Sequence, residues 1–169
     1  MRAIKNRTEI RRLRATDARE YRSALVEALI VHPDCFPEDY RSEISRPISD
    51  TEKELERDGV FGAWVGGAFA GIGSGVPCTA SKRRHTGSVQ NLYVKEKFRR
   101  KGIAGLLLQA ILQFASCNVE QLEVEVPAGC ENVVHLFEQF GFRMCGLVPG
   151  GLRVGQEELD VWTMIRPLR

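Results

Sequence analysis

The stretch LYVKEKFRRKGIAGLLL, residues 92–108, decides the fold, because it passes from strand composition to helix composition around a glycine. Residues 88–94 have strand composition, and the apolar residues of 102–115 recur at the helical spacing of three and four. The segment 121–126 then alternates apolar with polar residues, as a half-exposed strand does. Strand, helix and strand form one right-handed βαβ unit, so we expect the two strands to run parallel.

Hydrophobic periodicity and turn signals predict the remaining elements outward from this unit. Strands are expected over 10–14, 59–65, 68–76, 143–148 and 158–165, helices over 17–31 and 131–140, and helical fragments near 38–45 and 51–57. This order predicts an α+β (mixed α/β) fold. We expect a central, mostly antiparallel twisted sheet of about seven strands, with one parallel pair and with helices on both faces.

The composition is that of an ordinary globular chain. Of the 169 residues, 43% are hydrophobic and 27% are charged, so we expect a single domain over residues 1–169. The chain has no apolar run of about 18 residues and its first residues are too charged for a signal peptide, so we expect no membrane segment and a cytoplasmic location. The five cysteines form no Cys-x-x-Cys pair, which favours incidental thiols over a metal site.

The turn before the helix concentrates positive charge, since residues 95–101 contain five lysines and arginines. The first turn of a helix has unpaired N–H donors, and the small residues Gly102, Ala104 and Gly105 allow a phosphate to approach the backbone. The stretch therefore predicts an anion cradle that a pyrophosphate would fit. The alternative is that Gly102 only starts a helix and that the basic residues form a solvated edge.

The run of residues 92–108 resembles the acetyl-CoA-binding motif of the GCN5-related N-acetyltransferase (GNAT) family. Residues 136–142, LFEQFGF, resemble the second helix of that family and the Gly-Phe that follows it. Residues 158–164, ELDVWTM, resemble its closing strand, and residues 12–36 resemble the opening of small bacterial members. The resemblance therefore spans nearly the whole chain.

The resemblance implies that acetyl-CoA binds along the βαβ unit and that its acetyl group passes directly to an amine. The first strand of the unit would pair with the pantetheine arm, the cradle would hold the pyrophosphate, and the parting of the two strands would make a slot for the thioester. The cofactor-binding residues implied in this way are Leu92, Tyr93, Val94, Arg99, Arg100, Lys101, Gly102, Ile103, Ala104 and Gly105, with Cys130 and Phe137 beside the arm.

Two positions depart from the family pattern. Phe137 stands where the family usually has the tyrosine that protonates the leaving thiolate, and Cys130 stands where it usually has an asparagine that helps to hold the cofactor arm. Phe137 has no proton to donate, so the acid role would pass to water or to another side chain such as Tyr93. For the base, Glu125 matches a glutamate of the members that acetylate the N-termini of ribosomal proteins. The alternative is that Glu123 and Glu125 only face solvent.

Three functions follow from these observations. The first is an N-acetyltransferase that uses acetyl-CoA on the primary amine of a small molecule or a protein. The acidic residues Glu38, Asp39 and Glu43 indicate either a cationic acceptor or a solvated helix, and the resemblance allows a homodimer. The second is a CoA-binding module of the same fold with weak or no catalysis. The third is a small basic nucleic-acid binder, which the net charge of +2 does not favour.

Overall fold

The computed structural model describes residues 7–169, which contain one sheet of seven strands. The strands are β1 (Thr8–Arg12), β2 (Gly59–Val65), β3 (Ala68–Pro77), β4 (Thr86–Val94), β5 (Gln121–Pro127), β6 (Arg143–Val154) and β7 (Glu157–Pro167). Their order across the sheet is β1-β2-β3-β4-β5-β7-β6, and neighbouring strands are antiparallel except β4 and β5. The predicted α+β fold with one parallel pair is confirmed within these residues. Residues 1–6 of the expected domain over 1–169 lie outside the described residues.

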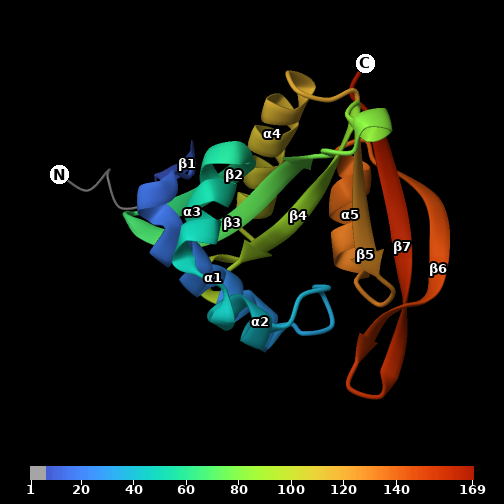
Figure 1. Ribbon diagram of the computed structural model, residues 1–169, viewed down its shortest axis with the longest axis horizontal. Helices are drawn as coiled ribbons and strands as arrows, with labels where there is room; N and C mark the ends of the chain where they lie inside the picture. Colours follow the sequence, from blue (N-terminus) through green and yellow to red (C-terminus); the bar gives the residue numbers. More distant parts are fainter. Residues whose placement is uncertain (1–6) are drawn as a thin grey trace.

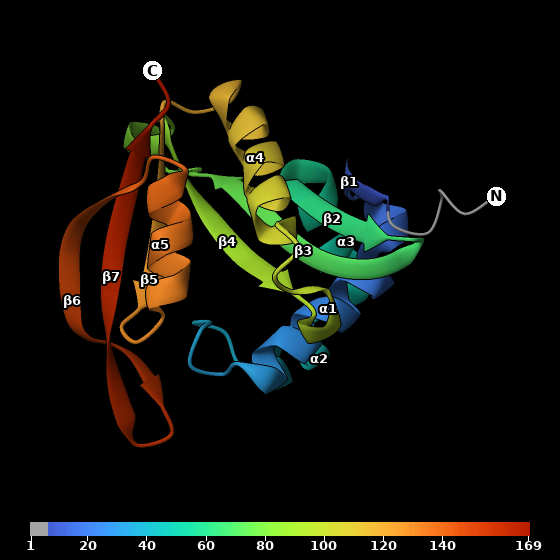
Figure 2. The same ribbon diagram turned by 180° about the vertical axis from the view of Figure 1, so that it is seen from behind.

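Five α-helices within the described chain cover both faces of the sheet (Figure 1). They are α1 (Ala18–Val31), α2 (Tyr40–Ser45), α3 (Ile48–Arg57), α4 (Ile103–Ser116) and α5 (Glu131–Gln139), with short 3-10 turns at Ala15–Asp17, Ser81–Arg83 and Glu96–Phe98. Helices α1 to α3 cover one face, whereas α4 and α5 lie on the other, as the two opposite views show (Figures 1 and 2). None of the described helices combines the length and the apolar character that a membrane crossing requires.

Each face of the sheet has its own buried core. On one face, Leu25 and Leu29 of α1 are buried against the sheet, because they recur at the four-residue spacing of one helix side. On the other face, Leu108 and Ile111 of α4 are buried together with Phe137 of α5. The sheet is therefore held between two apolar layers, and the helices fix the positions of the strand ends.

The two parallel strands pair only at one end. Residues 86–88 of β4 pair with residues 121–123 of β5, and the strands part beyond them. Strand β4 also has a bulge against β3, where Asn91 adopts a φ of 53°. A non-glycine residue in the left-handed region is uncommon, and bulges next to functional sites re-aim side chains. The divergence of β4 and β5 is visible in Figure 1, and it places the bulge beside the space between them.

The last two strands are longer than the sequence predicts. The sequence predicts strands over 143–148 and 158–165, and Pro149 and the glycines after it are poor strand residues. In the structure β6 continues to Val154 through an irregular stretch beyond Val148. Because β6 is the edge of the sheet, a proline there removes no hydrogen bond to a further strand.

Arg22 of α1 ties this helix to the corner between α2 and α3. Its guanidinium donates to the carbonyl oxygens of Arg46 at 2.8 Å and Pro47 at 3.0 Å and to the hydroxyl of Thr51. It also lies 3.5 Å from the carboxylate of Glu43. The Glu43 residue is 5% exposed, so its charge depends on Arg22 and Arg46 for compensation.

Replacing Arg22 with alanine is expected to lower the free energy of unfolding by about 3 kcal/mol, because Glu43 would keep a buried charge with one cation fewer. Urea unfolding followed by circular dichroism measures this change. Arg19→Ala on the same helix is the matched control, since Arg19 is exposed and its loss is expected to cost less than about 0.5 kcal/mol. Equal stabilities of the two variants would contradict this account of Arg22.

Candidate active site

A cavity of about 320 Å³ lies where β4 and β5 part. Its walls come from the bulged end of β4, the outer part of β5, one side of α5 with the residue before it, and the loop between α1 and α2. The lining residues are 88–92, 123–127, Cys130, Val133 and Phe137, with residues 35–38 of the loop. This cavity is referred to below as the slot, and its size is at the lower end of the range for small-molecule sites.

The turn before α4 has free backbone donors. Within residues 7–169, no acceptor bonds the N–H groups of residues 100–105. Arg100 has a φ of 60° and Gly102 has a φ of 75°, and such left-handed residues turn successive N–H groups toward one concavity. A Cβ at Gly102 would meet nothing within 4 Å, so the space before the helix is open. Residues 100–105, called the cradle below, have the geometry of an anion site at a helix N-terminus.

The side chain of Arg99 does not point into the cradle. Its Nε donates to the carbonyl oxygen of Val94 at 2.9 Å, and a terminal nitrogen lies 2.7 Å from Nε2 of His32. Because a guanidinium only donates, the imidazole nitrogen is the acceptor. The guanidinium also lies 5.8 Å from the centre of the Tyr93 ring. Arg99 therefore holds the turn against β4 instead of facing an anion directly.

The structure places the sequence-predicted residues in two groups. Leu92, Glu125, Cys130 and Phe137 line the slot together. In the cradle, Arg100, Lys101 and Gly102 are exposed, Ala104 and Gly105 are half-buried, and the side chain of Ile103 is buried in the core. Ile103 can thus offer only its N–H to a ligand.

Tyr93 lies between the two groups but faces away from both. Its side chain is not part of the slot lining, and its hydroxyl donates to Glu27 at 3.0 Å. Burial and the bond to Glu27 raise the pKa of Tyr93 to about 12. The geometry therefore does not favour Tyr93 as the replacement acid, because its hydroxyl donates to Glu27 outside the slot.

Phe137 and Cys130 occupy one wall of the slot. Phe137 is 1% exposed and packs edge-on against Phe142, with ring centres 5.0 Å apart. Cys130 begins α5, and its sulfur lies 3.5 Å from the sulfur of Cys35. The sequence does not predict this contact, because no local pattern connects two cysteines that are 95 residues apart.

Three carboxylates line the slot. Glu123 is paired with Arg83 at 2.9 Å. Glu125 lies two residues further along β5, on the same face as Glu123, and is exposed. In the described part of the chain neither Glu125 nor Glu38 has an ion-pair partner. Desolvation raises the pKa of Glu38. Glu38 is therefore a second candidate base that the sequence did not single out for this role.

A second, charged cavity of about 190 Å³ adjoins the slot. Glu38, Gln90 and Asn91 line both cavities. The charged residues of the second cavity are Glu38, Glu43, Glu54 and Asp58, with Arg46 and Arg57. Arg46 bonds Glu43 and Glu54, and Arg57 bonds Asp58. Within the described residues Glu38 is the lining carboxylate of this cavity that has no ion pair, which favours a cationic ligand there.

The sequence matches the model of the acetyltransferase (GNAT) family over residues 17–142. An N-alpha-acetyltransferase of Saccharolobus solfataricus is 32% identical over 84 residues, which make up 48% of this chain and 48% of that protein. The match to this curated relative therefore spans about half of its length.

Solved structures share the fold across almost the whole chain. A GNAT-family acetyltransferase from Streptococcus pneumoniae has a TM-score of 0.84 at 21% identity, covering 95% of this chain and 99% of that one. Ribosomal-protein-alanine N-acetyltransferase from Brucella melitensis has a TM-score of 0.81 at 21% identity, covering 94% and 99%. The putative acetyltransferase yncA from Salmonella typhimurium, solved with its cofactor acetyl-CoA, has a TM-score of 0.82 at 18% identity, covering 96% and 95%. Because the family model covers most of the sequence and the fold agrees, this chain belongs to the acetyltransferase (GNAT) family.

Proposed function

We propose that this protein transfers an acetyl group from acetyl-CoA to the primary amine of a small molecule or a protein. The observation that carries the proposal is that β4 connects a narrow slot, at residues 88–92, to free N–H donors at residues 100–105. Acetyl-CoA carries a pyrophosphate and, at the end of a narrow arm, a thioester. The pyrophosphate suits the free N–H donors and the narrow arm suits the slot. The family and the acetyl-CoA in the Salmonella neighbour support the same cofactor.

In this proposal the cradle binds the pyrophosphate and the slot holds the arm. Arg100 and Lys101 add positive charge beside the N–H groups. Leu92, Cys130 and Phe137 line the path of the arm and leave the thioester near the bulge of β4. An amine nitrogen attacks the thioester carbonyl, the carbon–sulfur bond breaks, and the thiolate of CoA leaves. With Phe137 in the wall, water supplies the proton to that thiolate.

The acceptor amine enters from the second cavity. The carboxylate of Glu38 there attracts a protonated amine, which must lose a proton before it attacks. Glu125 of the slot is the proposed base, and Glu38 is its competitor because it lines both cavities. The acceptor is thus either a small amine or an amine at the end of an extended chain, because it must reach the junction of the two cavities.

The proposal is tested first by calorimetric titration of the purified protein with acetyl-CoA and with CoA. Micromolar binding is expected, and no binding up to millimolar acetyl-CoA would contradict the proposal. A panel of polyamines, amino acids and peptide N-termini is then screened for release of the CoA thiol. If the protein binds acetyl-CoA but no amine gives release of the CoA thiol, the result favours the alternative, a cofactor-binding module without catalysis. The apolar side chain of Phe137 is the observation that favours this alternative.

Phe137→Tyr is expected to raise the rate of thiol release by about tenfold with an amine that responds, because the new hydroxyl can protonate the leaving thiolate. The dissociation constant of acetyl-CoA is expected to change little, since the ring keeps its place in the wall. Initial rates at fixed pH measure the effect. Phe142→Tyr is the matched control, because Phe142 packs on Phe137 but does not line the slot. Equal rates for wild type and Phe137→Tyr would contradict the assignment of the acid position.

A further inference from the structure

The side chains of Cys35 and Cys130 meet within the lining of the slot. Their sulfur atoms are 3.5 Å apart, both residues line the cavity, and both are free thiols. Cys35 lies on the loop after α1, and Cys130 is the N-cap residue of α5. Both views show this loop reaching toward the turn between β5 and α5 (Figures 1 and 2). The two elements therefore meet at a sulfur–sulfur contact beside the proposed path of the cofactor arm.

We propose that Cys35 and Cys130 form a reversible disulfide that closes the slot to the cofactor. The inference rests on the proposed function, because it takes the slot to be the path of the pantetheine arm. In the reduced protein a weak thiol contact joins the loop to the start of α5, and an entering arm can displace it. A covalent bond of about 2.05 Å would fix the loop to α5 and exclude the arm.

The oxidation balances with hydrogen peroxide as the two-electron oxidant. The sulfur of Cys130 attacks one peroxide oxygen, the O–O bond breaks, hydroxide leaves and a sulfenic acid forms. The sulfur of Cys35 then attacks that sulfur, the S–S bond forms, and the departing oxygen leaves as water with the thiol proton. Burial and the contact with Cys130 raise the pKa of Cys35, and Cys130 stands at the N-terminus of α5, where a helix favours a thiolate, so we assign the first attack to Cys130.

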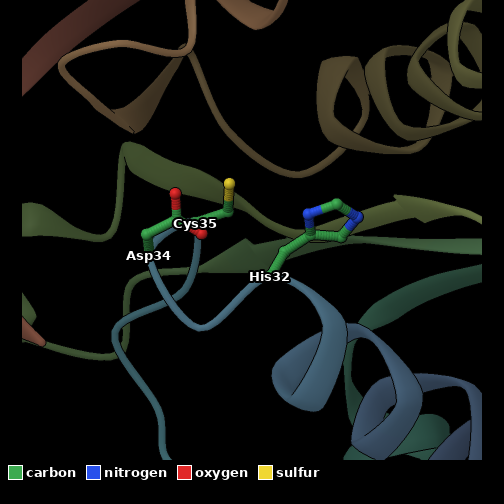
Figure 3. Close-up of side chains that lie close together, drawn as sticks. All are labelled: His32, Asp34 and Cys35. Atoms are coloured by element: carbon green, nitrogen blue, oxygen red, sulfur yellow. The ribbon is translucent and has the colours of Figure 1, made fainter.

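A thiophilic metal ion is the competing occupant of this place. His32, Asp34 and Cys35 lie together on the loop, and their ligand atoms are within 4.8 Å of one another (Figure 3). However, Nε2 of His32 already accepts a hydrogen bond from Arg99 at 2.7 Å, and that guanidinium repels a cation. The contacts therefore favour oxidation over metal binding, and zinc binding becomes an outcome of the test.

The test treats the full chain with hydrogen peroxide, removes the oxidant, and compares acetyl-CoA binding with that of the reduced protein. We expect peptide mapping without reductant to show Cys35 joined to Cys130, with the loss of two hydrogens. We also expect the dissociation constant to rise by about tenfold or more, and dithiothreitol to restore it. A Cys35–Cys130 disulfide that leaves binding unchanged would contradict the inference, as would oxidation that joins other cysteines.

Each variant is compared with its own reduced form. Cys35→Ser is expected to keep its affinity after peroxide, whereas Cys117→Ser, which changes an exposed cysteine, is expected to respond as wild type does. If Cys35→Ser fails to fold, reversal by dithiothreitol in the wild type decides the question. The reduced protein is also titrated with zinc. If it binds one equivalent and zinc protects both thiols from a thiol reagent, the two cysteines form a metal site and the redox inference is contradicted.

The same data separate the two proposals. A reduced wild type that does not bind acetyl-CoA, yet forms the Cys35–Cys130 disulfide, contradicts the proposed function while the bond itself stands. A reduced wild type that binds acetyl-CoA but never forms this disulfide contradicts the redox inference alone.

Discussion

A Gly102→Glu variant is expected to lose acetyl-CoA binding, with a dissociation constant raised by about a hundredfold or more. Gly102 precedes α4 within the cradle, and its φ of 75° leaves the N–H groups of residues 100–105 around an open space. A carboxylate there would take the place of a phosphate and repel the other phosphates of the cofactor. Calorimetric titration with acetyl-CoA measures the loss.

Gly67→Glu is the matched control for this variant. Gly67 has a φ of 84°, a Cβ there would also meet nothing within 4 Å, and the residue lies in the turn between β2 and β3. The substitution therefore adds a similar backbone strain and the same charge outside the cradle. We expect its dissociation constant to stay within about twofold of wild type. If Gly102→Glu bound acetyl-CoA as tightly as Gly67→Glu, the cradle would not be the pyrophosphate site.

Glu125→Gln is expected to lower kcat/KM by about a hundredfold with an amine that gives thiol release, because an amide cannot accept the proton of the ammonium group. Binding of acetyl-CoA is expected to persist, since Glu125 lies outside the cradle. The measurement combines initial rates with calorimetry, so that a loss of the chemical step is separated from a loss of the cofactor.

Glu38→Gln is the comparison that decides between the two carboxylates. A base acts in its deprotonated form, so the wild-type rate falls as the pH drops through the pKa of that base. Desolvation raises the pKa of Glu38, so an acid limb above the usual glutamate range would point to Glu38. A large loss in Glu38→Gln with none in Glu125→Gln would contradict the assignment of Glu125.

The parts of the fold that depend on nearby residues were predictable. The βαβ unit followed from the periodicity of residues 102–115, and the structure has α4 at Ile103–Ser116. The open N–H groups of the cradle followed from a glycine at a helix start, because helix ends leave donors unpaired whatever the rest of the chain does. The first strand was expected over 10–14 and covers Thr8–Arg12, an error at an element boundary that periodicity fixes poorly.

The parts of the site that depend on contacts between distant segments were not predictable. Glu38 belongs to a loop, and only the packing of that loop over the bulge of β4 brings its carboxyl to both cavities. Cys35 meets Cys130 for the same reason. Tyr93 is a candidate acid in the sequence, because the alternation of a strand predicts the face of the sheet on which a side chain lies. It does not predict the hydrogen-bond partner of that side chain. Here that partner is Glu27.

The short pairing of β4 with β5 gives the sheet two interior edges. Beyond residues 86–88 and 121–123, neither strand has a described strand neighbour on the facing side. Unpaired edges invite β-augmentation by a foreign segment. A cavity of about 320 Å³, lined in part by residues 35–38 of the loop, lies between these edges. We therefore propose that an amide-containing cofactor arm, and not a polypeptide, is the segment that pairs with these edges.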